Sequence, residues 1–155
     1  MSDDFTRLGT DLRLLGDLEQ QNSRMRGSDL FIRTRTETGK VDLATLTQVE
    51  NLQQALLLRF LTPVGELAQL GHPDYGCRLY ELIGEPNTET NRNRAKLYTL
   101  LALQAEPRVR EVLAVSVTTR RSQPTQVDIR ARVKVIDSDT ELNLVFPFFF
   151  EGATP

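Results

Sequence analysis

Residues 127–135 read VDIRARVKV, and this stretch decides the class of fold. The odd-numbered residues, from Val127 to Val135, are all aliphatic, whereas the four between them are one aspartate, two arginines and one lysine. A period of two residues is typical of a strand that buries one face and leaves the other in water. The stretch therefore predicts a half-solvated antiparallel strand.

Two further strands are expected on either side of it. Residues 111–119 (EVLAVSVTT) are rich in β-branched side chains, and residues 141–150 (ELNLVFPFFF) follow a tight turn at 137–140. Proline cannot donate to a strand ladder, so Pro147 places the last strand at the edge of the sheet. We expect Leu144, Phe146, Phe148 and Phe150 to face the core, while the edge could accept a strand from another subunit. The two interpretations are compatible, one for each face of the strand.

Two helices are predicted before this sheet. Residues 47–61 carry an apolar stripe at spacings of three and four, and Thr47 with Glu50 fits a capping box. Residues 89–105 form the second helix, with Leu97 and Leu101 on its apolar face, and Pro107 stops it. Between the helices, residues 71–84 are expected to form a loop and then a short helix, with Leu79, Leu82 and Ile83 pointing inward.

The N-terminal part is more polar. Residues 29–43 predict a short strand pair around Thr38 and Gly39, and residues 1–28 are interpreted as an arm, either docked or ordered by a partner or frayed. The expected fold class is α+β: two main helices packed on a small C-terminal antiparallel sheet, with a short N-terminal strand pair. The division is an arm at 1–28 and one domain at 29–155.

Composition excludes several classes of function. The 155 residues carry a formal net charge of -2, so general attraction to nucleic acid is not implied. One cysteine and one histidine exclude a disulfide framework and a Cys/His zinc site. The start resembles no signal peptide, and no apolar run approaches the roughly 18 residues of a membrane span. We expect synthesis in the cytoplasm and no membrane insertion.

Catalytic motifs are missing as well. The sequence holds no GxSxG, GxGxxG, P-loop or HExxH motif, and His72 lies in a turn-like segment. Glycoside hydrolysis needs only two carboxylates, but none of the acid pairs stands out. We expect no enzyme activity, no cofactor and no bound metal. The step Glu106-Pro107-Arg108 is more distinctive, because it either fixes a helix–strand junction or presents a charged fork to a partner.

Four short motifs stand in the order and spacing of a known family. They are LTPVGE at 61–66, HPDYG at 72–76, Arg78-Leu79 and Glu106-Pro107-Arg108. Through them the chain resembles the small baseplate wedge subunit of contractile tails. That family includes phage baseplate assembly protein W-like subunits, the lysozyme-like wedge protein of large contractile phages and a type VI secretion counterpart. The string at 71–91 is most similar to the version in extracellular contractile injection systems, although Leu67 stands where many members have arginine.

The resemblance implies a structural subunit of a phage tail-like particle, present in six copies. The family's Glu-Pro-Arg motif docks into the helical core bundle of the larger wedge subunits, and the C-terminal strands resemble the handshake fold of sheath subunits and exchange strands with the first sheath ring. Other baseplate or tube-end subunits are further expected partners. The residues so implicated are Glu106, Pro107 and Arg108 for the wedge; Thr62, Pro63, Gly65, Glu66, Pro73, Tyr75 and Gly76 for the loops; and Leu142, Leu144, Phe146 and Phe148 for the sheath-facing strand. The rival function is a peptidoglycan-cleaving, lysozyme-like tail enzyme.

Overall fold

The computed structural model describes residues 5–16, 18, 30–136 and 138–150. Its main sheet has three antiparallel strands, β5 (Val109–Arg120), β6 (Gln123–Val135) and β7 (Glu141–Phe149), in the order β5-β6-β7. The predicted meander is confirmed, and β6 is the central strand. The aliphatic residues of β6 are buried on one face, as the period of two predicts.

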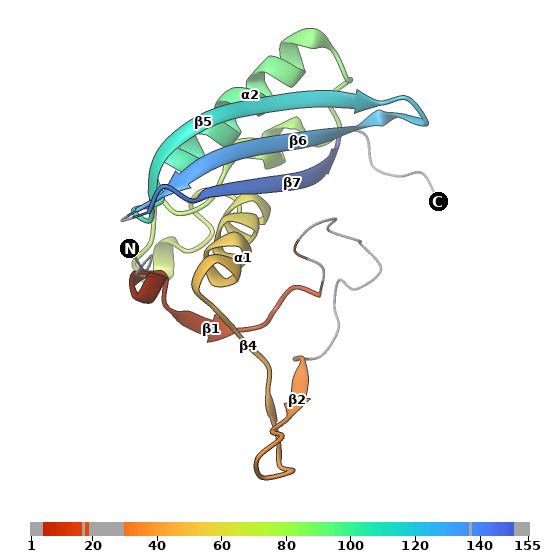
Figure 1. Cartoon of the computed structure of the whole chain (residues 1–155). Helices are drawn as coiled ribbons and strands as arrows, with labels where there is room; N and C mark the ends of the chain where they lie inside the picture. The colour runs from red at the N-terminus through yellow and green to blue at the C-terminus, as the bar shows by residue number, and fades with distance from the viewer. Residues whose placement is uncertain (1–4, 17, 19–29, 137, 151–155) are drawn as a thin grey trace.

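The two predicted helices are α1 (Gln48–Leu61) and α2 (Glu89–Gln104), and they lie on one side of the sheet (Figure 1). Helix α2 packs along β5, and α1 contacts β7. The core lies between the helices and the sheet, where Leu56, Phe60 and Leu103 meet Ile129 and Phe146. The α+β class is confirmed. No helix of the described residues is long and apolar enough to cross a membrane.

Two details of the helices differ from expectation. Thr47 precedes α1, but its side chain makes no capping hydrogen bond, so the predicted capping box does not form. In α2 the buried face is made by Ala95, Tyr98 and Ala102. Leu97 and Leu101 are about half exposed (50% and 49%), so the leucines expected to pack inward lie on the outer face. The spacing of apolar residues in α2 does not distinguish its leucine face from the adjacent alanine face, because both are similarly hydrophobic.

The short helix between α1 and α2 is a 3-10 helix, Arg78–Leu82. Leu79 and Leu82 are buried as predicted, but Ile83 is exposed. The reason is that the chain leaves the helix at Ile83 in extended conformation, so this side chain no longer follows the helical face. A second 3-10 helix, Ala68–Leu70, lies in the loop that precedes it.

In the described part of the N-terminal region, four short strands form two separate pairs. Strand β2 (Ile32–Thr34) pairs with β3 (Val41–Leu43), which confirms the predicted strand pair. Strand β1 (Thr10–Leu12) pairs with β4 (Thr45–Thr47) just before α1. The β2–β3 hairpin projects from the body of the molecule (Figure 1).

The described part of the N-terminal arm lies on α1 of its own chain. Leu8, at the end of the 3-10 helix Phe5–Leu8, is buried. The Gln54 side chain donates to the carbonyl oxygen of Leu12 (2.9 Å) and accepts from the amides of Leu14 and Leu15 (2.7 and 3.0 Å). The sequence predicts an arm with one short strand or one turn of helix, and the described part of the arm contains both. Its described contacts are with its own chain. Residues 1–4, 17 and 19–28 of it lie outside the described residues.

Candidate functional site

Three of the sequence motifs meet at one corner of the fold, around a residue that the motif comparison did not include. Arg59, near the end of α1, places its Nη2 atom 3.2 Å from Glu106 Oε2. The Arg59 guanidinium also lies over the ring of Tyr75, 4.3 Å from its centroid. The Arg108 Nε atom lies 2.6 Å from the other oxygen of the same carboxylate. We call Arg59, Thr62, Pro63, Tyr75, Gly76, Glu106 and Arg108 the motif junction.

Backbone contacts join the two loop motifs within this junction. The amide of Cys77 donates to the carbonyl oxygen of Thr62 at 2.8 Å, and Pro63 and Cys77 form an isolated parallel bridge. Gly76 has φ +122°, which L-residues rarely adopt. A Cβ atom there would overlap the carbonyl oxygen of Thr62 and lie 2.9 Å from the carbonyl carbon of Pro63. Glycine is therefore required by both conformation and space.

Glu106 is the electrostatic centre of the junction. Burial acts to raise the pKa of its carboxyl group, but the hydrogen bonds and charges of Arg108 and then Arg59 outweigh burial and hold that pKa below its usual range. Burial likewise raises the pKa of the Tyr75 phenol. The junction thus keeps a charged Glu106 between two arginines, and Arg59 Nε remains without a hydrogen-bond partner.

The junction is linked to the N-terminal arm. Arg108 Nη1 donates to the carbonyl oxygen of Leu8 at 3.3 Å, and the Asn51 side chain donates to the same oxygen at 2.9 Å. Arg108 therefore connects the end of α2, the start of β5 and the arm. This supports the interpretation of Glu106-Pro107-Arg108 as a fixed helix–strand junction, because Glu106 is buried and internally paired.

The other predicted loop residues lie on the surface beside the junction. Gly65, Glu66 and Pro73 are exposed, and Pro107 is exposed at the end of α2. Thr62 caps α1, and its hydroxyl donates to the carbonyl oxygen of Leu58 at 2.8 Å. Sequence reasoning missed Arg59, although a charged residue inside the apolar run LLLRFL of a predicted helix was a usable signal.

A shallow groove of about 130 Å³ runs between the motif loops and α2. Val64, Asp74, Gly76 and Arg78 line one wall, and Tyr98, Leu101, Ala102 and Ala105 line the other. The exposed Leu101 and Val64 give this groove an apolar rim. Leucines at the surface of α2 thus gather next to the motif junction.

The predicted sheath-facing strand is β7. Leu142, Leu144, Phe146 and Phe148 are all buried, so their side chains pack mainly in the chain's own core. Among the described residues no further strand pairs with β7, so the outward backbone groups of this edge strand are open to a partner. The sequence-based placement of Pro147 in an edge strand is confirmed.

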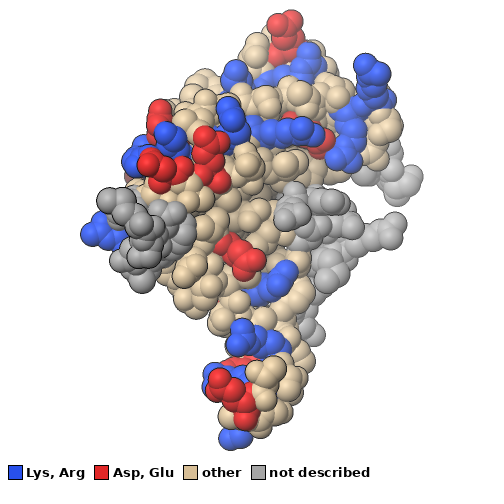
Figure 2. Space-filling view, in the orientation of Figure 1, with Lys and Arg blue, Asp and Glu red and all other residues tan. Residues whose placement is uncertain are grey.

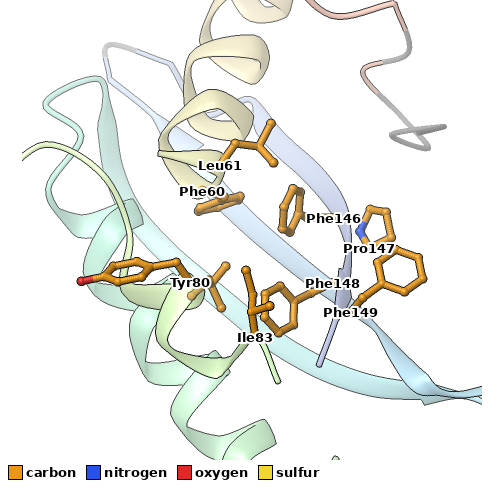
Figure 3. A pocket seen from close by; sticks show the side chains of 9 residues that line it. Phe60, Leu61, Tyr80, Ile83, Phe146, Pro147, Phe148 and Phe149 are labelled. Carbon is orange, nitrogen blue, oxygen red and sulfur yellow. The ribbon is translucent and has the colours of Figure 1, made fainter. Parts of the chain in front are cut away.

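An apolar groove of about 230 Å³ opens beside this edge (Figure 3). Leu61 from the end of α1, Tyr80 and Ile83 line one side, and Pro147 and Phe149 of β7 line the other, with Phe146 and Phe148 at its base. Leu61, Tyr80 and Ile83 are exposed large side chains. The edge of β7 therefore adjoins an open apolar surface.

Charged groups do not assemble into a metal site: the described residues contain no group of three or more His, Cys, Asp or Glu side chains that could hold an ion. Cys77 is buried as a free thiol, its Sγ atom 3.5 Å from the carbonyl oxygen of Tyr98, and burial raises the thiol pKa.

Comparisons with known proteins support the fold. No protein-family model matches the sequence, and no curated protein matches it. The chain is similar to the crystal structure of a Geobacter sulfurreducens protein described as a "putative tail lysozyme". The TM-score is 0.57 at 24% identity, over 68% of this chain and 93% of that one. At this identity the likeness shows a shared fold.

Proposed function

We propose that this chain is a structural subunit of the baseplate of a contractile, tail-like injection particle. The observation that carries the proposal is the motif junction. There, three of the four motifs that resemble the wedge-subunit family lie in contact, although they are far apart in the sequence. The fold shared with the described tail protein agrees with this assignment. In the proposed role, one surface binds the larger wedge subunits and another binds the sheath.

The wedge-binding surface consists of the groove rim and the exposed part of the junction. Glu106 is too buried to meet a partner, so it acts by positioning Arg108. Pro107, Leu101 and Val64 are exposed and lie where a helical bundle could pack on α2 and the motif loop. Apolar side chains of an interface centre contribute most of its binding energy, and the arginine adds directional hydrogen bonds.

The sheath-binding surface is the edge of β7. Backbone hydrogen bonds join Phe150 to Thr125 and Val135 to Thr140, so the even-numbered residues of β7 direct their N–H and C=O groups toward β6. The odd-numbered residues, including Asn143 and Val145, then direct theirs outward. An added strand would pair with this row. Pro147 is one of these odd-numbered residues, so its missing N–H removes no hydrogen bond between β6 and β7.

Two substitutions test these surfaces separately. Leu101→Asp places a charge on the wedge-binding rim, and Val145→Pro removes an outward N–H without removing one from the β6–β7 ladder. We expect both proteins to fold, Leu101→Asp to prevent incorporation into particles, and Val145→Pro to give baseplates without sheath in electron micrographs. Leu144→Pro, on the inward row, is the control that breaks the chain's own sheet. Normal sheathed particles from Leu101→Asp and Val145→Pro would reject the proposal.

The second candidate is peptidoglycan cleavage, favoured by the description of the similar structure. A glycosidase needs a general acid whose pKa is raised, and the buried carboxylate Glu106 has the opposite shift. A turbidity assay with purified protein on peptidoglycan separates the two candidates. Lysis that a single carboxylate-to-amide substitution abolishes would favour the enzyme.

A further inference from the structure

The β2–β3 hairpin is amphipathic and separate from the surfaces described above. Residues paired across it share a face, so Ile32, Thr34, Val41 and Leu43 lie on one side. Ile32 and Val41 are 67% and 64% exposed, among the most exposed large aliphatic side chains of the described residues. An apolar face of this kind on a projecting hairpin is unusual unless something covers it.

The opposite face of the hairpin carries charge. Arg33 lies across from Asp42, and Arg35 lies across from Lys40, whose carbonyl oxygen accepts from the Arg35 amide at 2.8 Å. Arg35 also forms an ion pair with Asp42. Three cations therefore share this face with one carboxylate, and Arg33 lies on β2 while Arg35 directly follows it. Figure 2 shows this mixture of charges at the projecting end of the molecule.

The outer edge of β2 has unpaired backbone groups among the described residues. The carbonyl oxygen of Phe31 accepts from Ala44, so the odd-numbered residues of β2 pair with β3 and Ile32 and Thr34 direct their N–H and C=O groups outward. On the far side of the hairpin, the Arg13 amide already binds Ala44 at the base of β3. The edge of β2 contains no proline and thus lacks the feature that interrupts β7.

A two-stranded sheet is marginally stable in water, and a third strand with an apolar face stabilises it. We propose that the edge of β2 is a second binding site, which accepts an extended strand of alternating aliphatic and acidic residues from another protein. The aliphatic residues of that strand would extend the face of Ile32 and Thr34. Its acidic residues would lie beside Arg33 and Arg35, where opposite charges across strands are favourable.

A second copy of this chain is a poor occupant. Edge-to-edge pairing of two β2 strands would place arginines beside arginines, and like charges across strands are destabilising. The apolar face of the hairpin also has only four residues, whereas a standard interface involves about 20–30 residues on each partner. Charge and area both favour a different protein that binds this chain at more than one place.

The test uses the full-length chain and a soluble heptapeptide of alternating glutamate and valine. We expect saturable changes in the NMR signals of the Ile32 and Thr34 amides, slower hydrogen exchange there, and weaker binding as the salt concentration rises. A peptide with the same residues in two blocks, and one with lysine in place of glutamate, are the controls. Equal binding of the block peptide, no binding, or changes confined to β7 would overturn the proposal.

A charge exchange sharpens the test. The double substitution Arg33→Glu and Arg35→Glu should reverse the preference, so that the lysine–valine peptide binds and the glutamate–valine peptide does not. Arg130→Glu, at an exposed site on the main sheet, should keep the original preference. Sedimentation velocity of the unmodified chain should show a monomer. A dimer that pairs through β2 would show instead that the added strand comes from a second copy of this chain, and would reject the proposal. The result is independent of the proposed baseplate role.

Discussion

Arg59 and Glu106 form an ion pair across 47 residues of sequence, with Nη2 and Oε2 3.2 Å apart and both side chains more than nine-tenths buried. The pair connects the end of α1 to the start of the main sheet. Arg108 holds the second oxygen of the same carboxylate, and Tyr75 covers the Arg59 guanidinium. The geometry of the motif junction therefore depends on one carboxylate.

The first prediction is that Glu106→Gln destabilises the fold by about 3–5 kcal/mol, because it leaves the buried Arg59 charge without its partner. Urea unfolding of the purified chain measures the change. The matched control is Asp139→Asn, which removes an exposed ion pair with Arg110 and should cost less than about 1 kcal/mol. Equal effects of the two substitutions would show that burial does not strengthen the role of Glu106. Because Glu106→Gln is expected to destabilise the fold, a Glu106 substitution in an assembly assay would test folding as well as docking.

The second prediction concerns acid stability. Arg108 and Arg59 lower the pKa of Glu106 in the folded state, against the effect of burial, from an ordinary value of 4.5. The resulting stabilisation is present above about pH 4.5, where the carboxylate of the unfolded chain is ionised, and is lost as the pH falls through the folded-state pKa. The free energy of unfolding of the unmodified chain should therefore fall more steeply between pH 5 and the folded-state pKa than that of Glu106→Gln. Parallel pH profiles for the two proteins would contradict this linkage.

The sequence predicted the main sheet and both long helices because those elements repeat a simple pattern over many residues. Strand β6 alternates for its buried length, and Pro147 marks the edge strand directly. The face of α2 was not predictable in the same way. Leucines and alanines occupy neighbouring faces of this helix, and the partner elements decided that the smaller Ala95 and Ala102 are the ones buried.

The candidate site was only partly predictable. Motif order identified Tyr75, Gly76 and Glu106, but not Arg59, whose role depends on a contact between distant segments. The motifs also suggested that Glu106 faces a partner, whereas the fold pairs it internally. A short motif records which residues occur together, and it does not distinguish a side chain that touches a partner from one that positions its neighbour.

The third prediction is that Gly76→Ala destabilises the chain by about 2–5 kcal/mol. The residue has φ +122°, and the added methyl group would overlap the backbone of Thr62 and Pro63. Gly65→Ala is the matched control in the same loop region, since Gly65 also has positive φ (+91°) but has no atom within 4 Å of the added methyl group. It should cost about 1–2 kcal/mol. Urea unfolding compares the two, and a smaller effect at Gly76 than at Gly65 would contradict the close packing of the loops.

The fourth prediction is that Gln54→Leu releases the N-terminal arm. Gln54 is fully buried on α1 and makes three hydrogen bonds to the backbone of the arm, at Leu12, Leu14 and Leu15. Leucine has a similar size but can make none of these bonds, so three partly buried backbone groups would lose their partners, at about 1 kcal/mol each. Releasing the arm returns those groups to water, which makes local detachment the less costly response. Hydrogen exchange at the amides of Leu14 and Leu15 should become much faster, while exchange in β6 changes little.

The control is Gln104→Leu, on the exposed side of α2, which should leave the arm protected. Slow exchange at Leu14 in the Gln54→Leu variant would contradict the prediction, because it would show that other contacts suffice to hold the arm.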